Sequence, residues 1–261
     1  MRATLLRLTG TLAIAAALAA GCNSTDTGSG SGSTTTTNAS ATGVWSGTDS
    51  TNDLTVTAII NAAGQATFIR SDGVQFVGTA DVSANNLAVT VDGYTNFPAA
   101  FADGSIHGIG TVMGTVTTAS TLTATLSFTT DGNTAIAGTW SLSYLAISGD
   151  ASSTGAISGN YTDSTTGAVL SITSSGVMSS QDTSTGCMLN GSVSTADSSH
   201  NVYEVAYSYE NCAGSYAVLN SVQFTGLATL NIAQSPSQLV IAVAGSSNTA
   251  KYGIVSTLNG S

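Results

Sequence analysis

The 261-residue sequence predicts an all-β protein built from two tandem antiparallel lobes of about eight strands each. Two observations carry this prediction. Apolar and hydroxyl side chains alternate with a period of two, as in Thr121–Phe128, which is typical of strands with one buried face. Asp-Gly pairs, a common signal for tight hairpins, fall between such runs at 72–73, 92–93, 103–104 and 131–132.

The chain begins with a segment typical of a secretory signal peptide. Arg2 and Arg7 precede an uncharged run rich in Ala and Leu, and small residues come directly before Cys22. The run of about 14 apolar residues is shorter than the roughly 20 that a membrane-spanning helix needs. One alternative is an ordinary signal cut at Ala17-Leu18-Ala19, which would leave Cys22 near a free terminus.

The segment Leu18-Ala19-Ala20-Gly21-Cys22 resembles the lipobox of bacterial lipoproteins, although Ala19 stands where that family usually has Leu. The resemblance implies that residues 1–21 are removed and that Cys22 carries acyl chains, including palmitate. Several acyl chains bind a membrane more firmly than a single acyl chain, whose binding is marginal. Asn23 after the cysteine implies, by the sorting rule of the family, anchoring at the outer membrane.

With Cys22 lipidated, Cys187 and Cys212 remain as a pair. An even number of cysteines in an exported protein favours a disulfide, worth about 3–4 kcal/mol for a loop of this length. A metal site is the alternative, but no other histidine or cysteine lies at ligand spacing from either residue.

The charge balance excludes several partners. Beyond the signal peptide, Arg70 and Lys251 are the only basic residues, against 14 acidic ones, a net charge of about −12. The chain therefore lacks the basic surface that nucleic acid requires. It also lacks the charge to dock on an anionic membrane surface, so the acyl chains must supply the anchor.

Residues 22–42 are expected to form the lipidated cysteine and a flexible Ser/Thr/Gly-rich tether. The N-terminal lobe is expected at 43–148, with strands at 43–48, 54–61, 66–71, 74–83, 86–92, 108–118, 121–129 and 136–146. The C-terminal lobe is expected at 149–261, with strands at 157–162, 167–173, 176–180, 187–195, 202–211, 222–232, 238–245 and 250–257.

The two lobes repeat each other. Thr48-Asp49-Ser50-Thr51 recurs as Thr162-Asp163-Ser164-Thr165. Three glycine landmarks keep nearly the same offset, namely Gly64 with Gly176, Gly78 with Gly191, and Gly114 with Gly226. The sequence therefore predicts an internal repeat of one β architecture.

Eight hairpin-linked strands suit a small up-and-down barrel, which leaves no exposed sheet edge. Gly43-Val44-Trp45 weakly resembles the opening of lipocalin and avidin-type barrels. A pair of β-sandwiches is the main alternative. A membrane-spanning barrel is disfavoured because several strands are shorter than the 9–11 residues it needs.

No catalytic residue, metal site or cofactor is expected. His107 and His200 are the only imidazoles that could act as a base near neutral pH. Their neighbours place His107 in a loop or at the start of a strand and His200 in a hairpin turn. The acidic cluster 49–53 lacks the ligand spacing of an EF-hand and fits turn chemistry. Glu204 and Glu210 lie about 20 Å apart on one strand face, too far for a carboxylate pair.

The opposite face of that strand carries Tyr203, Tyr207 and Tyr209. Tyrosine combines a large apolar area with a polar tip, so these residues are candidates for a binding face. The alternative, which we favour from the sequence, is that they form the core of the C-terminal lobe.

Together these features predict a lipid-anchored lipoprotein of the bacterial cell envelope that acts as a non-catalytic structural or interaction module. Its partner would be an unknown protein or small molecule, and not nucleic acid. One alternative is a lipocalin-like carrier of a small apolar ligand in a barrel lumen. A third is an enzyme whose site the sequence does not reveal.

Labelled palmitate should enter the wild-type chain in bacteria but not the Cys22→Ala variant, because the resemblance makes this thiol the acyl acceptor. The double variant Cys187→Ala/Cys212→Ala is the control and should still be labelled. Absence of label from the wild-type protein would contradict the anchor and leave a freely secreted β protein.

Overall fold

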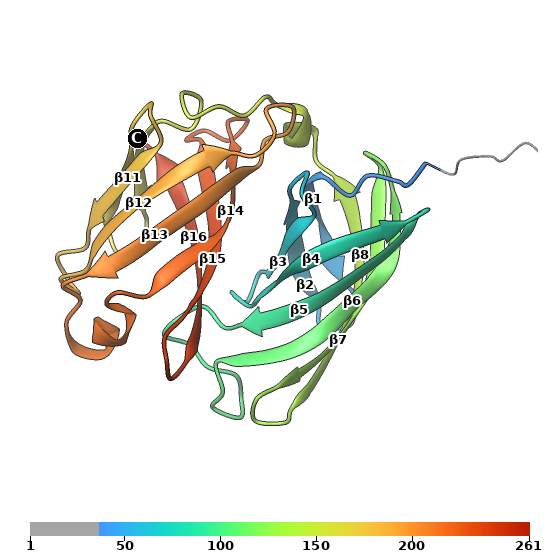
Figure 1. Cartoon of the computed structure of the whole chain (residues 1–261), viewed down its shortest axis with the longest axis horizontal. Helices are drawn as coiled ribbons and strands as arrows, with labels where there is room; N and C mark the ends of the chain where they lie inside the picture. Colours follow the sequence, from blue (N-terminus) through green and yellow to red (C-terminus); the bar gives the residue numbers. More distant parts are fainter. Residues whose placement is uncertain (1–36) are drawn as a thin grey trace, which may run out of the picture. The chain divides into compact units, whose positions relative to one another are not determined.

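The computed structural model describes residues 37–261, which contain two closed eight-stranded antiparallel barrels in tandem (Figure 1). The first barrel contains β1 (Gly43–Asp49), β2 (Leu54–Ile60), β3 (Gln65–Arg70), β4 (Gln75–Ser83), β5 (Asn86–Tyr94), β6 (His107–Thr117), β7 (Thr121–Thr130) and β8 (Ala135–Tyr144). The second contains β9 (Gly159–Asp163), β10 (Val169–Ile172), β11 (Val177–Gln181), β12 (Met188–Thr195), β13 (Tyr203–Glu210), β14 (Gln223–Asn231), β15 (Gln238–Ser246) and β16 (Lys251–Gly260).

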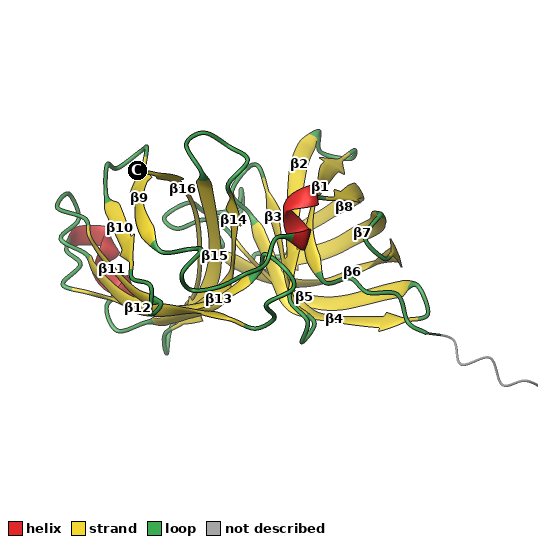
Figure 2. Ribbon diagram, turned by 90° about the horizontal axis from the view of Figure 1, so that it is seen from above, coloured by secondary structure: helices red, strands yellow, loops and turns green. Residues whose placement is uncertain are grey.

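Each strand pairs with its neighbours in the chain, and the first and last strands of each set pair to close the barrel. The predicted up-and-down barrels are therefore confirmed, and the sandwich alternative is wrong. Two 3-10 helices, red in Figure 2, are η1 (Ala146–Gly149) after β8 and η2 (Gly214–Leu219) between β13 and β14. No helix among residues 37–261 is long and apolar enough to cross a membrane.

One of the four predicted Asp-Gly turns is wrong. Asp92 and Gly93 lie inside β5 rather than between strands. A side chain at Gly93 would overlap the ring of Phe128, so this glycine makes room for an aromatic residue of the core. The pairs at 72–73, 103–104 and 131–132 do lie in turns or loops, and Gly73 and Gly104 have positive φ.

The predicted tether is wrong at its C-terminal end. Ala41 is 6% exposed and packs in the core of the first barrel, and its carbonyl accepts the indole N–H of Trp45 at 2.9 Å. The amide of Ala39 donates to the carbonyl of Ala84 at 2.6 Å. This end of the predicted tether therefore packs against the first barrel, even though it contains no large apolar side chain. Cys22, the predicted signal peptide and residues 23–36 of the predicted tether lie outside the described residues.

The internal repeat is also structural. Gly64 and Gly176 have φ of +83° and +84°, values that favour glycine, in the hairpins β2–β3 and β10–β11. Their carbonyls accept the amides of Ala80 at 2.7 Å and Val193 at 2.8 Å, on β4 and β12. The same turn therefore joins the same three strands in both barrels.

Each barrel has its own core. The first is filled by aromatic side chains that are at most 2% exposed, namely Trp45, Phe68, Phe76, Phe128 and Trp140. The second also contains five buried aromatic side chains, Tyr161, Tyr203, Tyr207, Phe224 and Tyr252, but no tryptophan. A third buried cluster joins the two barrels through their outer faces, and it contains Val44, Ile59, Ile69, Val202, Leu227 and Ala242.

Candidate functional site

A cavity of about 230 Å³ lies at one end of the second barrel. Inward-facing residues of β10, β12, β15 and β16, together with η2, form its apolar walls: Leu170, Leu189, Leu219, Ile241, Ile254 and Leu258. The volume is below the 300–1,000 Å³ usual for drug-sized ligands, so the cavity suits a small molecule.

The disulfide fixes one side of this cavity. Cys187 and Cys212 are bonded, as predicted, and join the start of β12 to the segment after β13. The side-chain amide of Asn220 accepts the amide of Cys212 at 2.9 Å and donates to its carbonyl at 3.1 Å. These bonds close the loop that carries η2, and η2 places Tyr216 and Leu219 on the cavity wall.

The three tyrosines of β13 divide between two roles. Tyr203 is buried in the core and does not line the cavity, whereas Tyr207 and Tyr209 form part of its wall. Their ring centroids are 5.3 Å apart. Burial raises the pKa of both hydroxyls, and the nearby carboxylates of Asp182 and Asp163 further raise the pKa of Tyr209.

The first barrel completes the wall of this cavity. β9 pairs with β16 over only three residue pairs, at Leu258–Gly260, so the edge of β16 continues past β9. The loop after β5 covers this edge: the amide of Phe97 donates to the carbonyl of Gly253 at 3.0 Å, and Asn96 bonds both the amide and the carbonyl of Val255. Asn96 and Phe97 therefore line a cavity of the other barrel.

Close packing supports this contact. The ring of Phe97 lies edge-on to Tyr216 and Tyr252, with centroids 5.5 and 5.7 Å away. A side chain at Gly253 would overlap Tyr94 and the amide of Gln75, both from the first barrel. Glycine at position 253 therefore allows β16 to lie against β4 and β5 of the first barrel.

The repeat places one aspartate at the same point in each barrel. In the first barrel, Asp49 ends β1, is 0% exposed and pairs in register with Trp140 of β8. Its carboxylate accepts the amides of Thr51 and Thr139, at 3.0 and 3.1 Å. Burial raises its pKa, but the hydrogen bonds outweigh burial and hold the pKa below its ordinary value. The indole N–H of Trp140 faces this carboxylate without the geometry of a full hydrogen bond.

In the second barrel, Asp163 ends β9 and pairs in register with Leu258. It is partly buried and lines the cavity. Its Oδ1 accepts the turn amides of Thr165 at 2.7 Å and Thr166 at 3.2 Å, while Oδ2 has no hydrogen-bond partner among residues 37–261. Leucine thus leaves space where the first barrel has an indole, and Oδ2 lacks the hydrogen bond that Asn52 gives to Oδ2 of Asp49.

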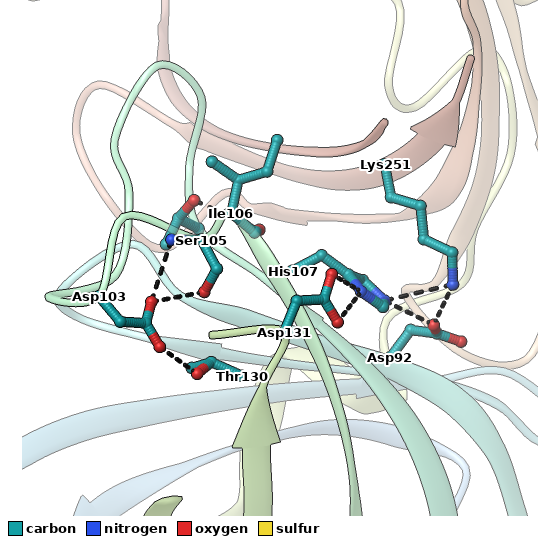
Figure 3. Close-up of polar contacts among 9 residues, drawn as sticks. Asp92, Asp103, Ser105, Ile106, His107, Thr130, Asp131 and Lys251 are labelled. Carbon is teal, nitrogen blue, oxygen red and sulfur yellow. Dashed lines mark hydrogen bonds and ion pairs between the residues drawn. The ribbon is translucent and has the colours of Figure 1, made fainter. Parts of the chain in front are cut away.

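A second polar cluster surrounds His107 at the contact between the barrels (Figure 3). The imidazole is 7% exposed, with Nδ1 3.0 Å from Asp131 and Nε2 2.7 Å from Asp92. Lys251, the first residue of β16, donates to the same oxygen of Asp92 at 2.7 Å. Both imidazole nitrogens face carboxylates, so the arrangement ties β5, β6 and β16 together and leaves no nitrogen directed at a substrate.

Neither histidine forms a catalytic triad. In Figure 3, Ser105 bonds Asp103 rather than His107. At the turn around His200, Ser199 and Asp197 both approach the same nitrogen, Nδ1, whereas a triad uses the two nitrogens separately. Among residues 37–261 no three His, Cys, Asp or Glu side chains are placed to hold a metal ion.

The two glutamates of β13 have different surroundings. Glu210 is exposed, in agreement with the solvent-facing reading. Glu204 is partly buried at the contact between the barrels, where it accepts the side-chain amide of Asn61 at 3.0 Å. Neither residue lines the cavity.

Sequence reasoning missed most of the cavity. Asn96, Phe97 and Leu258 carry no motif, and their role depends on which strands meet across the barrel seam. The sequence repeat identifies Asp163 as the equivalent of Asp49. The strand register is needed to show that Asp49 pairs with Trp140 whereas Asp163 pairs with Leu258. Comparisons of the chain with protein-family models, curated proteins and solved structures find no match.

The contact between Lys251 and Asp92 should make stability depend on pH. Burial raises the pKa of Asp92, but hydrogen bonds from Lys251 and His107 outweigh burial and hold it below its ordinary value of 3.8. A lowered folded-state pKa contributes stability above pH 3.8, and this contribution is lost as the pH falls through the folded value. Both side chains are nearly half exposed, so we expect Lys251→Met to lower the free energy of unfolding at pH 6 by less than about 1 kcal/mol.

Urea unfolding at pH 6, 4 and 2.5 measures this effect. The difference between wild type and Lys251→Met should vanish or reverse at the lowest pH, whereas Lys251→Arg, which keeps the cation, should follow the wild type. A difference that is constant over this pH range would show that the contact acts through packing instead of charge.

Proposed function

We propose that this protein is a lipid-anchored binding protein of the bacterial envelope, with a small ligand held at the open end of its second barrel. The observation that carries the proposal is the unequal filling of two barrels that share one topology. Each core contains five buried aromatic side chains, but only the first includes tryptophan, with Trp45 and Trp140, and the second lumen keeps a cavity of about 230 Å³.

The cavity wall combines apolar side chains with polar groups that could orient a ligand. Binding pockets are mostly apolar, with a few polar groups that orient the ligand. Here leucine and isoleucine side chains form part of the wall. The hydroxyl of Tyr209, the carboxylates of Asp163 and Asp182, and the side chains of Asn96, Thr166, Ser180, Thr185 and Ser256 supply the polar groups. Small eight-stranded barrels either fill with side chains or hold one ligand, and this chain combines the two outcomes.

The anchor and the charge fit the same role. The lipobox resemblance at Cys22 supports attachment to the outer membrane, and the Ser/Thr/Gly-rich residues that follow would let the barrels stand away from it. The barrels need no basic surface for membrane contact, in agreement with a net charge of about −12 beyond the signal peptide.

A second candidate function is that of an interaction module for another envelope protein. Three apolar side chains on the outer faces of the adjacent strands β10, β11 and β12 favour it: Val169 is 45% exposed, Val177 54% and Met188 37%. Exposed apolar groups on one face of a sheet are typical of protein contacts.

Leu258→Trp tests the binding function by restoring the side chain that the first barrel has at this position. In calorimetry with 2-phenylethanol as the probe, we expect the variant to bind at least tenfold more weakly than wild type, because the indole would occupy the cavity. A chain from residue 23 onward is suitable, because all sixteen strands lie within residues 43–260.

Ile232→Trp, at an exposed position outside the cavity, is the matched control and should bind the probe as wild type does. Leu258→Phe provides a smaller filling group if the indole impairs folding. No binding of 2-phenylethanol or its charged analogues to folded wild type would contradict the proposal. Binding of an envelope protein that survives Leu258→Trp but is lost in Val177→Asp would favour the interaction module.

A further inference from the structure

The charge around the cavity is unbalanced. Asp163 and Asp182 both line it, and neither forms an ion pair within residues 37–261. The two basic residues of that range are engaged elsewhere, Arg70 with Asp72 and Lys251 with Asp92. Two carboxylates beside the cavity therefore lack a positive partner within residues 37–261.

Hydrogen bonds favour the ionised form of Asp182, and one carboxylate oxygen of Asp163 has no partner within residues 37–261. Asp182 accepts the amide and the hydroxyl of Ser184, at 2.8 and 2.6 Å, and the hydroxyl of Thr185 at 2.9 Å. These hydrogen bonds hold its pKa below the ordinary value. Asp163 uses Oδ1 for its turn, so Oδ2 is available to a ligand.

Aromatic rings line the same cavity. Phe97 and Tyr216 form one edge-on pair, with centroids 5.5 Å apart, and Tyr207 and Tyr209 form another at 5.3 Å. The faces of aromatic rings attract cations, and cages of such rings recognise organic ammonium groups. Carboxylates and aromatic rings therefore favour the same charge in the ligand.

The first barrel provides an internal comparison. Its equivalent aspartate, Asp49, is covered by Trp140 and bonded by backbone amides and by the side chain of Asn52. Asp163 faces Leu258, which offers no donor. A ligand with a hydrogen-bond donor would give Asp163 a hydrogen bond of the kind that the protein itself gives to Asp49.

We infer that the ligand of the second barrel is a small organic cation, with an ammonium group held by Asp163 and Asp182 among the four aromatic rings and an apolar body against the leucine and isoleucine walls. This inference rests on the proposed binding function and names its ligand class. An anionic ligand would face two carboxylates and no cation, which is unfavourable.

Calorimetry with three probes of similar shape tests the inference: 2-phenylethylammonium, 2-phenylethanol and 3-phenylpropionate. At low salt and pH 7, the ammonium compound should bind at least tenfold more tightly than the alcohol, and the carboxylate should not bind measurably. Raised salt should reduce the difference in affinity between the ammonium compound and the alcohol, because screening weakens the attraction between the ammonium group and the carboxylates.

Asp163→Asn should weaken binding of 2-phenylethylammonium by at least fivefold and leave that of 2-phenylethanol unchanged, because asparagine keeps the turn acceptor but removes the charge. Asp81→Asn, at an exposed position of β4, gives the same change in net charge away from the cavity and should have no effect. Asp182→Asn is a second variant with the same expectation.

The outcomes separate the two proposals. If the three probes bind with equal affinity, or if Asp163→Asn and Asp182→Asn leave ammonium binding unchanged, the cationic ligand is overturned while the binding function stands. If none of the probes binds to the folded protein, both proposals fail.

Discussion

The second barrel is closed by three residue pairs between β9 and β16, and the arrangement of the site depends on this short seam. Residues 251–257 of β16 extend past β9, and backbone groups on a strand edge need hydrogen-bond partners. Asn96 and Phe97 of the first barrel provide them at Gly253 and Val255. One contact therefore joins the barrels, covers an exposed edge and brings an aromatic ring into the cavity wall.

The two repeats show how one backbone arrangement can give a packed lumen in one barrel and a cavity in the other. The hairpins at Gly64 and Gly176 have the same conformation, and an aspartate ends the first strand of each barrel. The difference lies across the seam, where Trp140 faces Asp49 and Leu258 faces Asp163. A buried aromatic side chain accounts for about 150–250 Å² of buried area, so leucine at this position leaves space. The free oxygen of Asp163 has a separate cause, because within residues 37–261 it lacks a partner equivalent to Asn52, which donates to Oδ2 of Asp49.

Local patterns could be predicted from the sequence, and contacts between distant segments could not. Alternation and turn residues predicted all sixteen strands, and the cysteine count predicted the disulfide. The turn predicted at Asp92-Gly93 is wrong because Gly93 makes room for the ring of Phe128 inside a strand. The tether prediction is wrong at Ala41 because this small side chain packs in the core of the first barrel. The cavity depends on the register of β9 with β16 and on a loop from the other barrel, neither of which leaves a periodic signal.

The central claim is that the second lumen is open and the first is filled. Crystals of the chain from residue 23 onward, placed under xenon pressure, test this directly, because xenon enters apolar cavities large enough to hold it. We expect xenon density beside Leu170, Ile241 and Leu258 in the second barrel and none around Trp140 in the first. Xenon in both lumens, or a second lumen closed by its own side chains, would contradict the account.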